Sequence, residues 1–212
     1  MRRSGGRGMM WTRVDWLAAL AAGIGLAVGI AGCDSSTGLN GDRGRMTVLL
    51  TDAPFPFDLV AEANVTISRV EVVGDAGVQV VAEGEQQLNL LDLQNGVTAT
   101  LGSAVLPEGG VSQIRLIVTD ASVVLTDGAT FDLTVPSGAQ TGIKILTPNA
   151  EIEAGAETTA TLDMDVSESF IVQGSVETVA GIDGFLFTPV VKLVAMETTS
   201  EETASEETTT GS

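Results

Sequence analysis

The chain has 212 residues, with 28 acidic and only 10 basic side chains, and a formal net charge of −18. It contains no His or Tyr, one Cys and two Trp. The lack of His excludes imidazole bases, His-ligated metals and Ser-His-Asp or Cys-His nucleophiles, because these mechanisms use the side chain that titrates near neutral pH. The acidity argues against nucleic acid as a partner, because a phosphate-binding surface needs clustered Lys and Arg.

Residues 1–32 have the composition of a secretory signal. Four arginines lead into an apolar run from Trp16 to Ala31, and this run ends in Ile30-Ala31-Gly32-Cys33. The last four residues resemble the lipobox of bacterial lipoproteins. That resemblance implies cleavage before Cys33 and its acylation by a fatty acid such as palmitate. The alternative is an uncleaved transmembrane helix, but a run of 16 residues is shorter than the ~20 residues that span a bilayer.

The lipobox also predicts a location. Acyl chains on Cys33 would anchor the protein in a membrane, outside the cytoplasm and within the bacterial cell envelope. Asp34 resembles the signal that retains lipoproteins at the inner membrane of enteric bacteria. That rule does not transfer between bacterial groups, so the choice between inner and outer membrane stays open.

Removal of the signal makes the chain more acidic. From Cys33 onward it holds 6 basic and 27 acidic residues, a net charge of −21. With Cys33 acylated, the exported domain has no thiol and no disulfide. Its core must therefore be aliphatic, and about 150 residues are enough to form one.

The pattern after the signal predicts three segments. Residues 33–45 are small and polar and are expected to form a flexible tether. Residues 46–196 are expected to form one domain. Residues 197–212 are an acidic, low-complexity Ser/Thr tail that is predicted to be disordered, because it has too little apolar surface to bury.

Within the domain, short runs of Val, Ile, Leu and Thr alternate with Gly, Pro and Asp turn signals. This pattern predicts an all-β fold, an antiparallel β-sandwich of Ig-like or prealbumin-like type. Strands are expected at 46–51, 62–73, 77–82, 87–91, 111–119, 122–126, 130–135, 143–147, 157–166, 169–180 and 185–195. The ambiguous segment 92–106 leaves room for a short helical turn.

Three local features refine these expectations. Asp127-Gly128 predicts a two-residue hairpin of type I′. The apolar phase changes at Ser68-Arg69, which predicts a bulge or a strand that passes from one sheet to the other. Pro189 lies inside the last run and predicts an edge or a bend there.

Several of these segments resemble one family. The carrying residues are TDAP at 51–54, VTISRVEV at 65–72, LNLLDLQNG at 88–96, LG at 101–102, LP at 106–107, QIRL at 113–116, VPSGAQTGIK at 135–144, LDMD at 162–165 and TPVVKL at 188–193. They are similar to the domain of unknown function family numbered 4382, over essentially all of 46–195. The resemblance implies an all-β envelope domain, often directly behind a lipobox. It implies no catalytic or binding residues.

The acidic motifs suggest a metal site. Asp163 and Asp165 alternate on one strand and therefore face the same way. Together with Asp52 they would form an oxygen-rich site that suits calcium. The alternative is that all three are solvent-facing residues of an acidic protein, since the sequence contains no EF-hand spacing.

Two further hypotheses concern catalysis. Ser137 and Lys144 could form a Ser-Lys dyad, but the simpler interpretation is a loop in which Gly142 opens a strand and Lys144 is an exposed charge. The acids of segment 151–157 are interpreted as a solvated hairpin, because nothing in the sequence identifies the cleft that paired-carboxylate glycosidase chemistry needs.

The aromatic residues bear on carbohydrate binding. The mature chain has no Trp or Tyr, and a Phe in a strand is more often a core residue than a sugar platform. Phe55 and Phe57 lie in a Pro-flanked loop and are interpreted either as the cap of one end of the sandwich or as an exposed tip for a partner.

Three functions follow from the sequence, and the first is favoured. The first is a non-enzymatic, lipid-anchored interaction or structural module of the envelope, whose partner is a protein or a polysaccharide. The second is a lipoprotein that binds calcium or a polysaccharide. The third is an enzyme limited to carboxylate, Ser or Lys chemistry.

Overall fold

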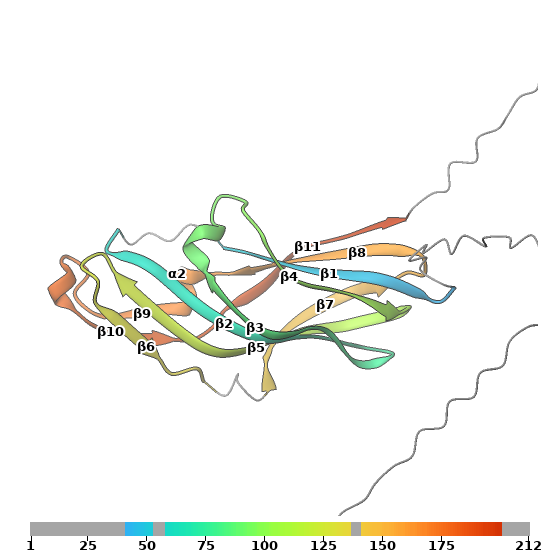
Figure 1. Ribbon diagram of the computed structural model, residues 1–212, viewed down its shortest axis with the longest axis horizontal. Helices are drawn as coiled ribbons and strands as arrows, with labels where there is room; N and C mark the ends of the chain where they lie inside the picture. Colours follow the sequence, from blue (N-terminus) through green and yellow to red (C-terminus); the bar gives the residue numbers. More distant parts are fainter. Residues whose placement is uncertain (1–40, 53–57, 137–140, 201–212) are drawn as a thin grey trace, which may run out of the picture. The chain divides into compact units, whose positions relative to one another are not determined.

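The computed structural model describes residues 41–52, 58–136 and 141–200 (Figure 1). Strands dominate this part of the chain, as the predicted all-β class requires. The strands are β1 (Arg43–Thr51), β2 (Val60–Gly74), β3 (Gly77–Asn89), β4 (Ala99–Pro107), β5 (Gly109–Leu125), β6 (Thr130–Leu133), β7 (Ile143–Ile152), β8 (Ala156–Met164), β9 (Phe170–Gly174), β10 (Ile182–Phe187) and β11 (Val191–Ser200). Two 3-10 turns, η1 (Leu90–Leu93) and η2 (Val179–Gly181), and one short helix, α2 (Val166–Ser169), join them.

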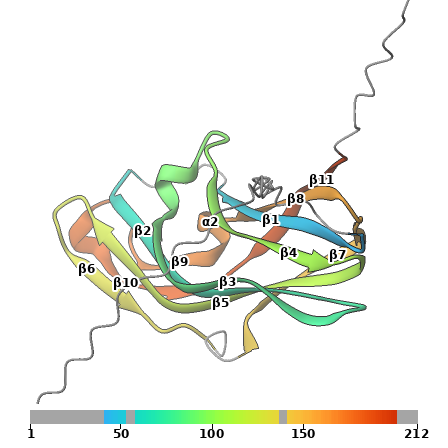
Figure 2. The same ribbon diagram turned by 45° about the vertical axis from the view of Figure 1, so that its right-hand side comes forward.

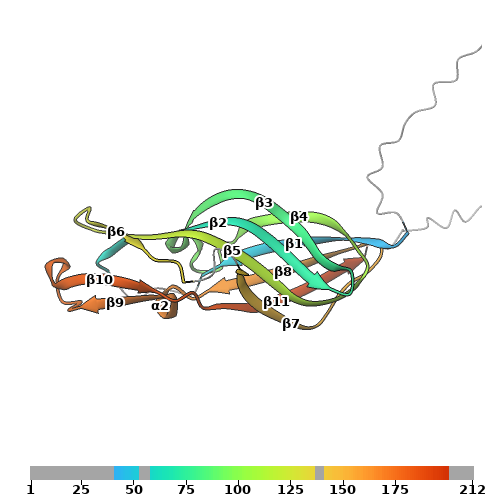
Figure 3. The same ribbon diagram turned by 90° about the horizontal axis from the view of Figure 1, so that it is seen from below.

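The strands form two main sheets and a ribbon. One sheet has the order β11-β8-β1-β4, and the other has the order β3-β2-β5, with β6 and β7 both paired to β5. The two sheets face one another in the view from below (Figure 3). Most neighbouring pairs are antiparallel as predicted, but β1 and β8 are parallel. β9 and β10 form a separate two-stranded ribbon, and β10 lies beside β6 in both side views, where Phe131 and Phe185 meet edge to face (Figures 1 and 2).

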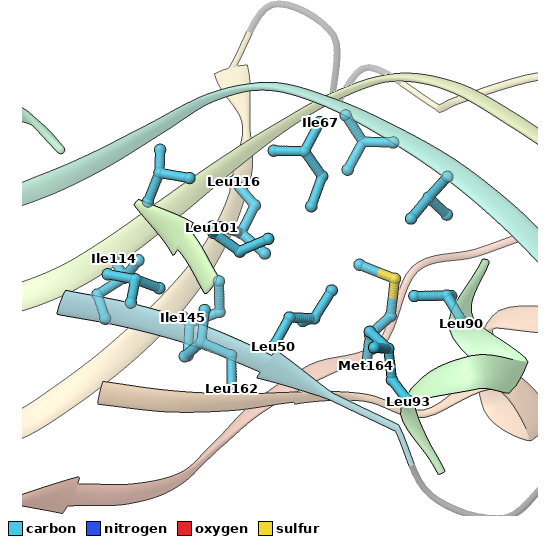
Figure 4. Close-up of a cluster of buried hydrophobic side chains, with 14 of the residues drawn as sticks. Leu50, Ile67, Leu90, Leu93, Leu101, Ile114, Leu116, Ile145, Leu162 and Met164 are labelled. Atoms are coloured by element: carbon cyan, nitrogen blue, oxygen red, sulfur yellow. The ribbon is translucent and has the colours of Figure 1, made fainter. Parts of the chain in front are cut away.

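A single aliphatic core lies between the sheets (Figure 4). Leu50 and Leu162 come from the four-stranded sheet, and Ile67 and Leu116 come from the five-stranded sheet. All four side chains are at most 2 % exposed. Each sheet buries alternate residues, because successive side chains of a strand point to opposite faces. The predicted aliphatic core is therefore confirmed for the described domain.

The predicted change of phase in β2 is a bulge. Ile67 and Val70 are both buried although they are three residues apart. The pairing of β2 with β3 and with β5 shifts register between Ile67 and Arg69. The extra residue, Ser68, donates its hydroxyl hydrogen to the carbonyl oxygen of Ile117 at 3.3 Å. The bulge thus keeps both halves of a long strand facing the core.

The structure corrects several strand boundaries. The expected strands 111–119 and 122–126 are one continuous strand, β5, because Ala121 between them is buried and pairs with β6. Residues 87–89 continue β3, and the ambiguous segment contains β4, with η1 at its start. Residues 43–45 and 197–200, assigned by sequence to the tether and the tail, are ends of β1 and β11. These residues are ordered by backbone hydrogen bonds to a neighbouring strand. Such pairing does not depend on side-chain hydropathy, so the hydropathy pattern did not predict it.

Two turns also differ from expectation. The hairpin after β5 has a three-residue loop and not the predicted two-residue type I′ loop. Gly128 donates its N–H to Leu125 O, and Leu125 donates its own to Ala129 O. Gly128 has a φ of 91°, so a type I turn followed by a left-handed glycine satisfies the hairpin twist. At the second position, Pro189, the chain leaves the β9–β10 ribbon and enters the four-stranded sheet as β11, which confirms the predicted bend.

Several predictions fall outside the described residues. These are the signal 1–32, Cys33, Asp34, the loop residues Phe55 and Phe57, Ser137, and tail residues 201–212. In the described part of the chain, no helix has both the length and the hydropathy needed to cross a membrane.

Candidate functional site

Two polar regions on the domain gather the motif residues, and the first lies where β1 ends. Asp52 is only 4 % exposed. Its Oδ1 accepts the N–H of Val166 at 3.0 Å, and its own N–H donates to Leu93 O at 3.2 Å. The hydroxyl of Thr51 donates to the carbonyl oxygens of Leu93 and Val97. Thr51 and Asp52, the two described residues of the TDAP motif, therefore connect the end of β1 to η1 and to the start of α2.

The LDMD and TPVVKL motifs meet at the same place. Asp165 donates its N–H to Val190 O at 3.1 Å, and Thr188 donates its N–H to Ser169 O at 2.8 Å. The fully buried hydroxyl of Ser169 accepts the N–H of Val190 at 2.9 Å. We call this meeting point the polar junction, defined by Asp52, Asp163, Asp165, Ser169 and Lys192.

Asp165 caps the short helix of the polar junction. Its Oδ1 accepts the backbone N–H of Glu168 at 3.0 Å and the hydroxyl of Ser167 at 2.7 Å. Burial acts to raise the pKa of the Asp165 carboxyl, but these hydrogen bonds and the charge of Lys192 outweigh burial and hold the pKa below its usual value. The carboxylate is therefore ionised at neutral pH and serves as a helix N-cap.

Lys192 supplies the positive charge of the polar junction. Its Nζ lies 3.0 Å from Oε2 of Glu168 and 3.8 Å from Oδ2 of Asp165. It also stands opposite Asp163 in the pairing of β11 with β8. The hydrogen bond and charge of Glu168, and then the charges of Asp165 and Asp163, raise the pKa of Lys192 above its usual value.

The structure thus brings together the three residues of the hypothesised calcium site. Asp163 pairs in register with Thr51, the neighbour of Asp52, and Asp165 follows two residues later. Here, however, the carboxylates of Asp52 and Asp165 already bind backbone N–H groups, and Asp165 also pairs with Lys192. Among the described residues, no three His, Cys, Asp or Glu side chains lie close enough together to hold a metal ion. Calcium binding at the polar junction stays a prediction.

The second polar region lies on the outer face of the five-stranded sheet and includes Lys144. Lys144 is exposed on β7 while Ile145 is buried, as the simpler interpretation of this segment predicts. Gly142 opens the segment with a φ of 71°, and a Cβ there would approach Ile117 Cδ1 to 2.7 Å. Ser137, the other member of the hypothesised dyad, lies outside the described residues.

Lys144 lies on the rim of a hollow of about 670 Å³. The lining residues come from β2, β3, β5, β7 and the segment before β7: Ser68, Arg69, Glu71, Glu83, Gly84, Glu85, Arg115, Ile117, Thr141 and Lys144. This hollow was not predicted from the sequence. One signal was present, since Arg69, Arg115 and Lys144 are three of the four basic residues in 46–196.

Ion pairs order part of this hollow. Nη2 of Arg69 lies 2.5 Å from Oε1 of Glu83, and its Nη1 lies 3.5 Å from Oε1 of Glu71. Arg115 approaches the other oxygen of Glu71 at 3.8 Å. The hydrogen bond and charge of Glu83, followed by those of Glu71, raise the pKa of Arg69. The guanidinium groups are therefore held in place across three neighbouring strands.

The remaining candidate residues are the acids of segment 151–157 and the Phe residues of the strands. The acids of segment 151–157 are exposed, as predicted, but they do not flank a hairpin. Strand β7 pairs with β5 in one sheet, while β8 pairs with β1 and β11 in the other, so the turn crosses between the sheets. Phe170 and Phe187 are buried and packed together, with ring centroids 4.9 Å apart, as expected of core residues.

Comparison with known proteins identifies a family and shows a distant structural likeness. The family described as "Domain of unknown function (DUF4382)" matches residues 43–189. The search of curated proteins found no match. Among solved structures, a "putative cell adhesion protein" from Bacteroides uniformis is similar, with 13 % sequence identity and a TM-score of 0.21. The likeness covers 75 % of this chain and 51 % of that one, so this chain spans about half the length of that protein.

Proposed function

The chain belongs to the DUF4382 family, and from this premise we propose that it is a lipid-anchored, non-enzymatic module of the bacterial cell envelope. The observation that carries the proposal is the use of the motif side chains. Asp52, Asp165 and Ser169 all bind backbone groups of neighbouring elements. Their chemistry holds the sandwich together and leaves the outer sheet faces to meet a partner.

The anchor part of the proposal rests on the sequence before β1. The lipobox ends at Cys33, and β1 begins at Arg43, so nine residues lie between the anchor cysteine and the first residue of the first strand. A tether of that length would keep the domain close to the membrane surface. Two or more acyl chains would give a stable anchor, whereas one alone binds marginally. The net charge of −16 over 46–196 (4 basic, 20 acidic) would repel anionic lipid headgroups and favour presentation away from the bilayer.

The experiment that tests the anchor replaces Cys33 by Ser. We expect Cys33→Ser to lose metabolic labelling by palmitate and to retain its signal peptide, because the thiol is the acceptor for the lipid. The matched control restores a cysteine three residues later, as Cys33→Ser combined with Ser36→Cys, and should not regain the label. A Cys33→Ser protein that is cleaved normally and still carries palmitate would overturn the lipoprotein proposal.

A specific observation favours a second function, ligand binding. The hollow that contains Arg115 and Lys144 is formed by ordered strands, and its ionic groups are already positioned. A module that displays such a surface would act by binding, with no chemical step. The class of ligand is argued below.

A further inference from the structure

A second hollow lies next to the hollow beside Lys144 along strands β2 and β5. The second has a volume of about 300 Å³ and is lined by Asn64, Thr66, Gln87, Asp120, Ala121, Ser122 and Asp132. Along β2 its residues come directly before those of the first hollow. Along the antiparallel β5 they come directly after them. We call the two hollows together the outer-face groove.

The lining of the outer-face groove is almost entirely hydrogen-bonding. Its side chains supply guanidinium, ammonium, carboxylate, amide and hydroxyl groups, and the apolar exceptions are Ile117 and Ala121. A lining that contains both hydrogen-bond donors and acceptors suits a chain of sugar hydroxyls, because each hydroxyl group can donate one hydrogen bond and accept others. Peptides bound on sheets instead use apolar pockets for alternate side chains, and this lining offers none.

Charge in the groove is distributed differently from charge on the rest of the domain. Arg69, Arg115 and Lys144 face the first hollow, and only Lys192 among the basic residues of 46–196 lies elsewhere. Three carboxylates of the first hollow, Glu71, Glu83 and Glu85, balance them. The first hollow is therefore neutral in a domain that is otherwise strongly acidic.

One pair of cations in the hollow has no structural explanation. Arg115 and Lys144 are direct cross-strand partners in the pairing of β5 with β7. Like charges in directly opposed positions destabilise a sheet. Arg115 has Glu71 on its other side, 3.8 Å away, but Lys144 makes no ion pair with any described residue. Placing a second cation beside Arg115 makes physical sense if an anionic group binds between them.

We propose that the outer-face groove binds an acidic polysaccharide and that Arg115 and Lys144 hold the carboxylate of a uronic acid unit. Nε and Nη2 of Arg115 face the side-chain oxygen of Gln113 at 2.6 and 2.8 Å, and Nη1 faces Glu71. Arg115 would therefore contribute its charge and a remaining N–H, and Lys144 would add a point charge. The carboxylates and amides of the second hollow would accept and donate hydrogen bonds with the neutral hydroxyls of the adjoining sugar. A phosphate or sulfate group, with its denser charge, is disfavoured by the three glutamates around it.

This inference rests on the proposed function, since it names the ligand class of the displayed module, but the two can fail separately. The probe is an oligogalacturonate, and its matched control is the same oligomer with its carboxylates methyl-esterified. Binding to the full-length chain in detergent is measured by titration calorimetry. The Cys33→Ser variant should bind equally well, so loss of the lipid tests the anchor and leaves the groove untouched.

We expect the protein to bind the oligogalacturonate with higher affinity than its methyl ester. Lys144→Gln should weaken binding of the acid by about three- to tenfold, the loss of one charge-assisted contact. Lys192→Gln removes the one basic residue of 46–196 outside the groove and should leave affinity unchanged. Lys144→Gln should also melt at a temperature no lower than that of the wild type, which shows that the fold is intact.

Four outcomes would overturn the proposal. These are no binding of the acid, equal binding of acid and ester, undiminished binding by Lys144→Gln, and equally tight binding of inorganic phosphate or of an oligoglutamate. The last would show a site for any oxyanion or acidic peptide, with no selection for a saccharide.

Discussion

The polar junction and the outer-face groove use the same residue types for opposite purposes. At the polar junction, Asp52 is buried and accepts a backbone N–H, and Lys192 sits between Glu168 and Asp165. In the groove, Lys144 is exposed and stands beside another cation, Arg115. At the polar junction, these side chains bind groups of the protein itself. In the groove, the charge of Lys144 faces solvent.

This difference separates architecture from recognition. A buried polar group must find a partner inside the protein, because an unsatisfied one costs free energy. At the polar junction, Asp52 Oδ1 and the Ser169 hydroxyl follow this rule by binding backbone N–H groups, so these contacts stabilise the fold whatever the protein binds. An exposed cation has no such requirement, and the place of Lys144 beside Arg115 is consistent with the ligand site proposed above.

The largest expected effect is at Asp52. Asp52→Ala leaves the buried N–H of Val166 without its acceptor, and we expect the free energy of unfolding to fall by about 1–3 kcal/mol. Chemical denaturation monitored by circular dichroism measures this change. Asp58→Ala, at an exposed turn, is the matched control and should change stability by less than about 0.5 kcal/mol. Equal effects of the two substitutions would mean that the polar junction does not hold the sandwich together.

A smaller effect is expected at Asp165. Asp165→Ala removes the N-cap of α2 and should lower the free energy of unfolding by about 0.5–2 kcal/mol. The pKa of Asp165 in the folded state lies below its usual value of 3.8. Its stabilising contribution is therefore full above that value and is lost as the pH falls through the folded-state pKa.

The comparison with Asp165→Asn isolates the charge of this residue. Its stability deficit relative to the wild type should be constant near neutral pH and should shrink as the pH falls below about 4. Denaturation midpoints across that range measure the change. A deficit that grows on acidification would show that the carboxylate is not stabilised in the folded protein.

The smallest change in stability is expected for substitutions in the groove, and whether stability rises or falls is the informative result. Lys144→Gln removes a repulsive cross-strand pair and should leave stability unchanged or raise it by about 0.2–1 kcal/mol. Arg69→Gln, which removes ion pairs to Glu71 and Glu83, should instead lower the melting temperature slightly, because exposed ion pairs contribute little to stability. Thermal melts of both variants make the comparison. A clear loss of stability in Lys144→Gln would assign Lys144 to the architecture, as at the polar junction.

Much of the fold could be predicted from the order of apolar residues. The alternation at Ile114 and Leu116, and the phase change between Ile67 and Val70, identify the buried faces and the bulge, because period-two burial leaves a direct trace in the sequence. The type I turn before Gly128 was not predicted, because Asp-Gly suits both a two-residue and a three-residue loop. The strand ends at 43–45 and 197–200 were also not predicted, because backbone pairing at the end of a strand places few demands on side chains.

By itself, the sequence determined the all-β class, the aliphatic core, the family resemblance and the mature acidity, since these depend on composition and local periodicity. The tertiary structure alone decided which strands are neighbours. It brought Asp52 of the TDAP motif to the LDMD and TPVVKL segments at one polar junction, across more than one hundred residues of sequence. It also placed Arg69, Arg115 and Lys144 around one hollow. The physical reason is that strand pairing links segments of any sequence separation through backbone hydrogen bonds, which are the same for every residue type except proline.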